Sequence, residues 1–300
     1  MTDVAIRGLT KRFGAVAAVS DLTFDVPAGR ITGFLGPNGA GKTTTLRMAL
    51  DLIRPTAGHA LIGGRRYRDL PHPRRVVGAL LESTGLHPGR RGRDHLRVLA
   101  TVAGASPARV AEVLDLVELT DAADRRVGGY SLGMRQRLGL AAALLGDPEV
   151  LVLDEPANGL DPAGMAWLRG LLRDQAARGR AVLVSSHLLS EVSQSVDDIV
   201  VISHGELRAS GPLDRVLGEA EGGGTRVRAA DRDALAAALE AAGIEFAPGD
   251  GGALLAGGTT PEAVGTAANE HHIALSELVS VGRSLEDVFF ELTQQEEEEK

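Results

Sequence analysis

The chain contains no cysteine, so disulfide bonds, thiolate metal sites and cysteine nucleophiles are all excluded. Aromatic residues make up only 3% of the sequence, and a core drawn from its 44% apolar residues must therefore consist mainly of Leu, Val, Ile and Ala. Long hydrophobic runs are also missing. The longest, such as residues 138–145, fall far short of the roughly 20 residues that a membrane-spanning helix needs. These absences favour a cytosolic protein that does not itself cross a membrane.

The sequence has no excess of basic residues. Its 32 Lys and Arg against 40 Asp and Glu give a formal net charge of −8, which argues against a nucleic-acid-binding surface. Arginine clusters at residues 65–68 and 90–93 have little aromatic interleaving, and we interpret them as solvated loop charges or partner contacts. We therefore expect no nucleic acid among the partners.

Strand and helix patterns alternate over most of the chain. The strand patterns with the clearest apolar character lie at residues 4–9, 19–26, 150–153, 181–185 and 198–202. The last three are separated by helices, which predicts a largely parallel sheet covered on both faces. Residues 88–146 are mainly helical. We predict an α/β nucleotide-binding core over residues 1–216, with an N-terminal antiparallel strand layer and a helical insertion.

A second, smaller domain is predicted after a change of composition. Residues 217–224 are rich in Gly and Glu and predict a linker. The order strand, helix, strand, strand, helix, strand over residues 225–292 predicts a small α+β domain. The acidic run that follows, in residues 293–300, predicts a disordered tail.

Residues 36–43 read Gly-Pro-Asn-Gly-Ala-Gly-Lys-Thr and are the most informative stretch of the chain. They follow a short apolar strand and open a helical pattern, which is the setting a phosphate-binding loop requires. The glycines allow successive N–H groups to turn inward around an anion, and the helix start adds its positive dipole end. Lys42 can then reach the β- and γ-phosphates, and the Thr43 hydroxyl can ligate Mg²⁺.

The choice of lysine at this position supports the assignment. The chain has only three lysines, Lys11, Lys42 and Lys300, and otherwise uses arginine. A lysine supplies a compact point charge, whereas arginine presents a planar fork. The pattern therefore predicts binding of a nucleoside triphosphate.

Two carboxylates follow a strand that the pattern places in the parallel sheet. Asp154 and Glu155 come directly after four apolar residues, and the carboxyl ends of parallel strands meet at the edge where the loop lies. We expect Asp154 to hold the Mg²⁺ shell and Glu155 to act as general base toward water. His187 follows another strand at the same edge and can donate to the γ-phosphate or to the water.

Ser131 and Gly133 stand at the start of a predicted helix. The serine hydroxyl offers an N-cap, and the neighbouring N–H groups can face an anion. Taken alone, this pattern is an ordinary helix start.

Together these elements have the order and spacing of the ATP-binding subunits of ABC transporters, which the chain resembles over residues 1–215. The resemblance implies a P-loop ATPase fold in which residues 36–44 are the Walker A loop and residues 131–133 belong to the signature motif. It implies that Asp154 and Glu155 are the Walker B aspartate and the catalytic glutamate, and that His187 is the switch histidine. The catalytic residues expected are Glu155, His187 and Lys42.

The resemblance also implies which residues contact the nucleotide. Phe13 matches the aromatic residue that stacks on adenine, although a place in the core of the strand layer is the other interpretation of this side chain. Residues 158–161 match the D-loop. The expected nucleotide contacts are Phe13, Gly36, Asn38, Gly39, Ala40, Gly41, Lys42, Thr43, Thr44, Ser131, Gly133 and Asp161.

The chain departs from the common family pattern at three positions. Leu132 and Met134 replace the glycine and glutamine of the usual signature, whereas Ser131 and Gly133 are kept. Glu82 stands where the family usually has glutamine, so the metal ligands expected are Thr43, Glu82 and Asp154. The glutamate adds negative charge beside the phosphates. In having a glutamate at this position, the chain resembles the exporters of bacitracin- and lantibiotic-type peptides. Residues 284–289 resemble the C-terminal end of type-2 drug-exporter ATPases.

The resemblance implies an ATPase with ATP and Mg²⁺ as cofactors, working as a homodimer or with a related ATPase subunit. Two chains would close head to tail, so that Ser131 of one completes the γ-phosphate site of the other. The expected partner is a separate multi-spanning export permease. Drug or antibiotic efflux is one candidate function, and the sequence leaves peptide, lipid and ion export open as well. Contact with the membrane is expected only through that permease, at the inner face of the plasma membrane.

Three other functions are alternatives to a transport ATPase. An ATP-driven switch acting on ribosomes or DNA is the main alternative, although such proteins tend to carry paired cassettes or long coiled-coil arms. A GTPase is disfavoured because no Asn-Lys-x-Asp guanine-binding element occurs. Binding without hydrolysis is disfavoured by the presence of Glu155 and His187.

Overall fold

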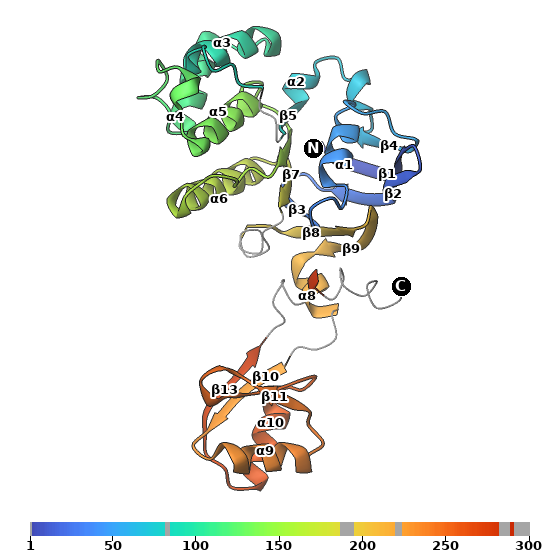
Figure 1. The fold of residues 1–300 in the computed structure, drawn as a ribbon, viewed down its shortest axis with the longest axis vertical. Coiled ribbons are helices and arrows are strands. Elements are labelled where there is room, and N and C mark those ends of the chain that lie inside the picture. The colour runs from blue at the N-terminus through green and yellow to red at the C-terminus, as the bar shows by residue number, and fades with distance from the viewer. Residues whose placement is uncertain (1, 82–84, 187–194, 220–223, 282–288, 291–300) are drawn as a thin grey trace. The chain divides into compact units, whose positions relative to one another are not determined.

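The computed structural model describes residues 2–81, 85–186, 195–219, 224–281 and 289–290. The chain forms two compact units, unit 1 over residues 1–213 and unit 2 over residues 214–291 (Figure 1). The phosphate loop and both carboxylates belong to unit 1.

Unit 1 contains a three-stranded and a six-stranded sheet. The three-stranded sheet is antiparallel, with the order β2-β1-β4, and the six-stranded sheet has the order β5-β6-β7-β3-β8-β9. All neighbours in the larger sheet are parallel except β8 and β9. The strands are β1 (Val4–Phe13), β2 (Val16–Val26), β3 (Ile31–Leu35), β4 (Ala57–Ile62), β5 (Val77–Leu80), β6 (Val150–Asp154), β7 (Ala181–Ser186), β8 (Asp198–Ser203) and β9 (Glu206–Pro212).

The burial of the strands follows from their sequences. Strands β3, β6, β7 and β8 are buried along their whole length, as expected for nearly continuous apolar strands in a sheet covered on both faces. The second half of β2 alternates buried and exposed residues, which is the pattern of a strand with one face on the core. One hydrophobic cluster joins the antiparallel layer, helix α1 (Lys42–Ala49) and the parallel strands, so the loop before α1 is held between two sheets.

A helical insertion separates β5 from β6. It contains α3 (Gly92–Ala103), α4 (Pro107–Leu116) and α5 (Leu132–Leu144), and Figure 1 shows these helices together at one end of unit 1. Ser106 and Ser131 cap α4 and α5 by accepting a backbone N–H through their hydroxyl groups. The long helix α6 (Pro162–Ala177) connects β6 to β7. Shorter turns of helix are η1 (Tyr67–Asp69), α2 (Pro73–Val76) and η2 (Val127–Gly129).

Unit 2 is a four-stranded antiparallel sheet with helices packed on it. The strand order is β11-β12-β10-β13, and the helices α9 and α10 share a hydrophobic core with the sheet. The elements are α8 (Leu213–Glu219), β10 (Gly224–Ala229), α9 (Arg232–Ala241), β11 (Phe246–Pro248), η3 (Asp250–Gly252), β12 (Leu254–Ala256), α10 (Pro261–Glu270) and β13 (Leu275–Val281). The predicted fold class, an α/β core with a strand layer and a helical insertion plus a small α+β domain, is confirmed.

Two features differ from the sequence-based expectations. Helix α8 runs to Glu219, so the first part of the predicted linker 217–224 is helical. Leu213, Val216 and Leu217 have the spacing of one face of a helix. The Gly and Glu content of the residues that follow led to the prediction of a linker instead. Strand β9 was not predicted because its sequence ends in Ser-Gly-Pro, and it forms by pairing with β8 at the edge of the sheet.

Two further expectations concern the ends of the chain and the membrane. The predicted tail 293–300 lies outside the described residues. Among the helices that the structure describes, none combines the length and hydropathy that a membrane crossing requires.

Candidate functional site

At two glycines of the loop between β3 and α1, the neighbouring backbone leaves no room for a side chain. A Cβ atom on Gly36 would lie 2.5 Å from the carbonyl oxygen of Ile202, and one on Gly41 would lie 2.5 Å from that of Ala18. Gly41 also has a φ of +102°, which L-residues rarely adopt. The backbone therefore approaches its neighbours more closely here than a side chain allows, and the loop closes tightly.

The start of α1 is open to an anion. Its N-cap residue is Gly41, which has no side chain to accept the first N–H groups of the helix, and no side-chain cap is present. The loop is stabilised instead by backbone bonds, with Ala40 N–H donating to Pro37 O at 3.1 Å and Thr45 N–H to Gly41 O at 2.9 Å. Uncapped N–H groups and the helix dipole together favour a phosphate at this end.

Lys42 lies inside the loop with only 7% of its surface exposed. Its ammonium donates to the carbonyl oxygens of Gly36 at 2.6 Å and Pro37 at 3.3 Å, and it lies 3.8 Å from Glu155 Oε1. Burial lowers the pKa of Lys42, and the negative charges of Glu155 and Asp154 oppose that shift. The buried cation would gain from an additional anion at short distance.

Asp154 and Thr43 bring two oxygen donors together. Thr43 Oγ1 donates to Asp154 Oδ2 at 2.8 Å, and Ser185 Oγ donates to Asp154 Oδ1 at 2.6 Å. The carboxylate is 1% exposed, so these hydroxyls supply the hydrogen bonds that a buried charge requires. Hydroxyl and carboxylate oxygens are the ligands that Mg²⁺ prefers, and the pair faces the uncapped end of α1.

Glu155 follows Asp154 with a φ of 49°, in the left-handed region that is strained for a glutamate. The strain is held by three backbone contacts. Its N–H donates to Ser185 Oγ at 3.0 Å, while its carbonyl accepts from Gln136 Nε2 at 3.0 Å and from Asn158 N–H at 3.2 Å. The carboxylate is thereby fixed on the side of Lys42.

An open pocket lies over the loop, and seven of the sixteen predicted site residues line it. Its lining includes backbone and side-chain groups of the loop together with Glu155 and a residue of the following turn: Ala18, Pro37, Asn38, Gly39, Gly41, Lys42, Thr43, Thr44, Glu155 and Asn158. Gly36 and Ala40 support the loop from beneath. The structure thus brings the Walker A residues, Asp154 and Glu155 into one place.

Other predicted residues are described but do not line this pocket. Ser131 caps α5, accepting the N–H of Met134 at 3.1 Å, and Gly133 follows in the first turn of the same helix. Asp161 caps α6 by accepting the N–H of Gly164 at 2.8 Å. Within one chain these groups therefore lie apart from the phosphate loop.

Phe13 ends β1 with half of its surface exposed and with Lys11 Nζ 4.9 Å from its ring centre. This exposure excludes the interpretation of Phe13 as a core residue of the strand layer. His187 and Glu82, predicted as the switch histidine and a metal ligand, lie outside the described residues.

Two functional residues were missed by the sequence analysis. Ser185 contacts both carboxylate-bearing residues, and Gln136 binds the backbone of Glu155 from α5. The available signal for Ser185 was a polar residue in an otherwise apolar strand. Gln136 gave no such signal, because its partner is a backbone carbonyl that only the fold brings near.

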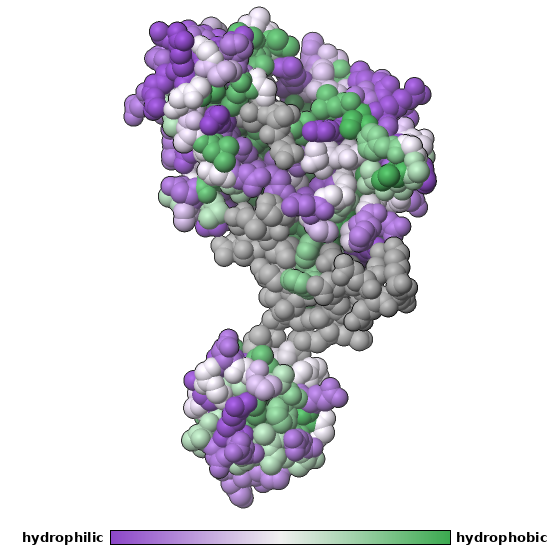
Figure 2. Space-filling model, viewed as in Figure 1, coloured by the Kyte–Doolittle hydropathy of each residue, from purple (hydrophilic) through white to green (hydrophobic). Residues whose placement is uncertain are grey.

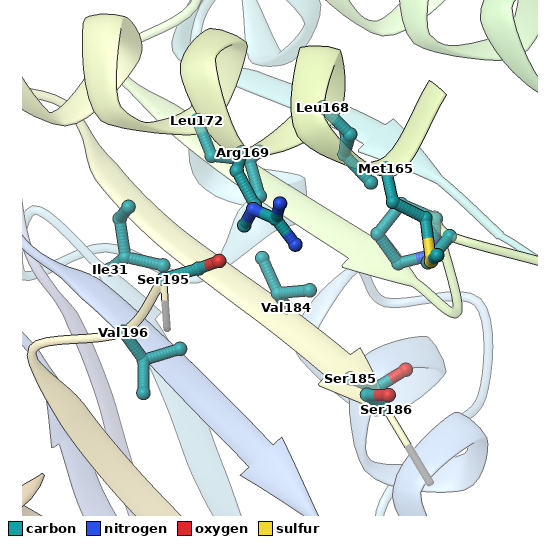
Figure 3. A pocket seen from close by; sticks show the side chains of 12 residues that line it. Ile31, Met165, Leu168, Arg169, Leu172, Val184, Ser185, Ser186, Ser195 and Val196 are labelled. Atoms are coloured by element: carbon teal, nitrogen blue, oxygen red, sulfur yellow. The ribbon is translucent and has the colours of Figure 1, made fainter. Parts of the chain in front are cut away.

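A second cavity lies between α6 and the sheet and is lined mostly by apolar side chains (Figure 3). The close-up labels Met165, Leu168 and Leu172 from the helix and Val184 from the sheet. A triphosphate needs polar donors, which this lining provides only sparsely. The cavity therefore does not compete with the loop as the site of an anion.

Comparisons with known proteins agree with this geometry. A family profile described as "ABC transporter" matches residues 19–158, and one described as "Domain of unknown function (DUF8746)" matches residues 223–286. An uncharacterised ABC transporter ATP-binding protein of Bacillus subtilis, YhcH, is 44% identical over 209 residues, which is 69% of this chain and 68% of that protein.

Two similar proteins have names that state a transport role. The bacitracin transport ATP-binding protein BcrA of Bacillus licheniformis is 41% identical over 72% of this chain and 71% of its own length. The lantibiotic transport ATP-binding protein SrtF of Streptococcus pyogenes is 35% identical over 67% of this chain and 87% of its own length.

Solved structures show the same fold. An ATP-binding subunit of an ABC transporter superposes with a TM-score of 0.67 at 30% identity, covering 72% of this chain and 92% of that one. A dimeric bacterial ABC transporter cassette superposes with a TM-score of 0.65 at 22% identity, covering 70% and 98%. The uncapped phosphate loop, the paired carboxylates and these similarities lead to one conclusion: the chain belongs to the family of ABC transporter ATP-binding proteins, which are ATPases coupled to transport.

Proposed function

We propose that this chain hydrolyses ATP to power an export permease that is a separate polypeptide. The observation that carries the proposal is the convergence of Lys42, Thr43, Asp154 and Glu155 on the uncapped end of α1. The similarity to proteins named for bacitracin and lantibiotic transport supports an antibiotic or drug as cargo and a role in antibiotic resistance. These names do not favour the alternative of a switch acting on ribosomes or DNA.

Mg²⁺ fits the oxygen donors of the site. Thr43 and Asp154 supply a hydroxyl and a carboxylate 2.8 Å apart, and the predicted ligand Glu82 follows β5, the neighbour of β6. Among the residues that the structure describes, no three acidic or histidine side chains meet. The remaining ligands would be phosphate oxygens and water, as is usual for Mg²⁺, which would neutralise charge on the phosphates.

The roles of the protein groups follow from their positions. The N–H groups of the loop and the Lys42 ammonium hold the β- and γ-phosphates and oppose the charge that develops on them. Glu155 is fixed by its backbone contacts where it can orient a water molecule and accept its proton. We assign His187 to the γ-phosphate by resemblance, and Phe13, which is exposed, to the adenine ring.

A second chain would complete each site. Ser131 and Gly133 lie at the exposed end of α5 and apart from the phosphate loop of their own chain. In a head-to-tail dimer this end would face the γ-phosphate bound by the other chain, and Asp161 would lie in the same interface. The similarity to a dimeric cassette supports this arrangement.

The surface of unit 1 offers a place for the permease. A cleft between the helical insertion and the region around α1 is lined by apolar residues, among them Leu50, Leu52, Leu81, Leu99 and Leu145. Figure 2 shows hydrophobic residues reaching the surface near α1 and α3. Exposed apolar patches of this kind mark interaction sites, and docking there would place the chain at the inner face of the membrane.

The proposal is tested by Glu155→Gln in the full chain. The amide keeps the shape of the side chain but cannot accept the proton, so turnover should fall by roughly 100-fold or more while ATP binding persists. The rate of phosphate release and the retention of nucleotide by gel filtration measure the two effects. Glu240→Gln, the same change at an exposed site on α9, is the control and should leave the rate unchanged. Hydrolysis at the parent rate by Glu155→Gln would refute the role of this residue.

A further inference from the structure

The exposed end of α5 packs on the loop that follows Glu155. A Cβ atom added to Gly159 would lie 2.4 Å from both Cγ and Cδ2 of Leu132 and 3.1 Å from its Cβ. A Cβ atom added to Gly133 would lie 2.9 Å from the carbonyl oxygen of Gly159. The first turn of α5 is therefore in direct contact with the loop at Gly159, with no room for a further methyl group.

Helix α5 contacts the same loop a second time, one turn later. Gln136 Nε2 donates to the carbonyl oxygen of Glu155 at 3.0 Å. Between the two contacts the loop is closed by its own backbone bonds, from Asn158 N–H to Glu155 O at 3.2 Å and from Leu160 N–H to Ala157 O at 3.0 Å. A short, hydrogen-bonded segment therefore connects the end of α5 to Glu155.

Both ends of this segment have a left-handed backbone. Glu155 has a φ of 49° and Gly159 a φ of +78°. This conformation is unstrained for glycine but strained for a glutamate, so at Glu155 it persists only where the surroundings hold it, and these include Gln136 of α5. The position of Glu155 therefore depends on α5 as well as on β6.

Leu132 has no evident role in stabilising the core. Leu132 is 59% exposed, so it contributes little to the buried core. It stands at the position where the common signature has glycine, a residue that could make no side-chain contact with Gly159. The side chain of this leucine lies directly against Gly159, in the loop that follows Glu155.

We propose that Leu132 is a positioning residue that couples the two ATP sites of a dimer. When the end of α5 engages the γ-phosphate bound by a second chain, Leu132 presses on Gly159 and sets the position of Glu155 in its own site. Each site then responds to the nucleotide in the other. This inference rests on the proposed two-site ATPase and adds to it a residue that links the sites.

The test is a double-mutant cycle in the full chain, read as the Hill coefficient for ATP, kcat and KM. Leu132→Ala removes the contact and should bring the Hill coefficient down to about 1, with KM changed less than about threefold because no nucleotide contact is lost. Leu132→Met, which keeps a long apolar side chain, should retain the parent coefficient.

The second arm of the cycle is Gly159→Ala. This change adds backbone strain and a clash with Leu132, and kcat should fall by about tenfold or more. In the double variant Leu132→Ala/Gly159→Ala the two contacts at 2.4 Å are removed, and only the Cβ contact at 3.1 Å and the backbone strain remain, so kcat should recover by at least about threefold. Gly179→Ala is the matched control, since its φ is +83° but a Cβ atom there meets nothing within 4 Å. It should leave the Hill coefficient unchanged and add independently to Leu132→Ala.

The outcomes separate this inference from the proposed function. Parent-like cooperativity in Leu132→Ala, or additive effects of Leu132→Ala and Gly159→Ala on kcat, would overturn the role of Leu132 while leaving the ATPase intact. A parent chain that hydrolyses ATP with a Hill coefficient of 1 overturns it as well. A parent chain that does not hydrolyse ATP in the presence of Mg²⁺ contradicts the proposed function itself.

Discussion

Helices α1 and α5 both begin beside a glycine, and both present N–H groups that can bind an anion. The two ends are nevertheless built differently. At α1 the N-cap is Gly41, no side chain takes up the first N–H groups, and Lys42 lies buried in the loop. At α5 the Ser131 hydroxyl accepts the N–H of Met134, and both Ser131 and Leu132 are exposed.

The difference shows which end can work alone. The start of α1 lies in a pocket lined by the loop, the Lys42 cation and the Glu155 carboxylate, so it can enclose most of a phosphate group. The start of α5 has an exposed serine, and the described residues of its own chain give it no comparable lining. An anion there would be open to water and weakly held unless a second surface covers it. The chain therefore carries one nearly complete phosphate site and one end suited to completing another.

Among the predicted changes, removal of the Lys42 ammonium from the α1 end should lower ATP hydrolysis the most. Lys42→Ala takes away the buried ammonium, which lies 3.8 Å from Glu155 Oε1. We expect ATP hydrolysis to fall by roughly 100-fold or more, because charge on the transferring phosphate is no longer opposed. Phosphate release measures the loss. Arg97→Ala, which removes an exposed cation on α3, should keep the parent rate, and a similar loss there would point to a general charge effect.

Changing the α5 end should reduce hydrolysis without removing the phosphate loop. Ser131→Ala is expected to lower the rate by roughly 10- to 100-fold through loss of a phosphate donor, with ATP binding to the monomer preserved. Because Ser131 also caps a helix, Ser106→Ala on α4 is the matched control for the loss of a cap alone. An equal loss of rate in both variants would reduce Ser131 to a structural role.

Mixing the two defective chains sharpens the same comparison. In a dimer of one Lys42→Ala and one Ser131→Ala chain, one site carries both defects and the other carries neither. Random pairing should therefore restore roughly a quarter of the parent rate, if the intact site works alone. Coupling between the sites would lower that fraction. A mixture no more active than its components would contradict the head-to-tail dimer.

The smallest expected effect is a pH dependence of the free energy of unfolding that arises from His95, in the helical insertion that contains α5. His95 on α3 is 5% exposed, and burial together with the positive charge of Arg90 lowers its pKa. The unfolded chain takes up a proton near pH 6.5, whereas folded His95 stays neutral to lower pH. Stability should thus fall below about pH 6.5, with a slope of at most about 1.4 kcal/mol per pH unit, and show no contribution from His95 above it.

Urea unfolding of the parent and of His95→Leu at pH 7.5 and 5.5 measures this contribution. The variant should show a smaller loss of stability at the lower pH. His271→Gln, at an exposed position of unit 2, should behave like the parent. An unchanged pH dependence in His95→Leu would show that another group is responsible.

The chemistry-bearing residues could be predicted largely because they are local in sequence. Glycine spacing over a few residues identifies the phosphate loop 36–43. Carboxylates at the end of an apolar strand identify Asp154 and Glu155. Ser185, Gln136 and the contact of Leu132 with Gly159 could not be predicted, since each depends on a partner more than 15 residues away. Strand β9 was missed for a similar reason, because pairing with β8 outweighs its low strand propensity.

The amino-acid sequence alone determined the phosphate loop, the order of the α/β core, the small α+β domain and the membership of the family, because glycine spacing and apolar periodicity act over short distances. Tertiary structure alone decided that Asp154 is held between Thr43 and Ser185, that Phe13 is exposed, and that the end of α5 rests on the loop after Glu155. These features arise from close packing and from hydrogen bonds between distant segments, and such contacts exist only once the sheets have formed.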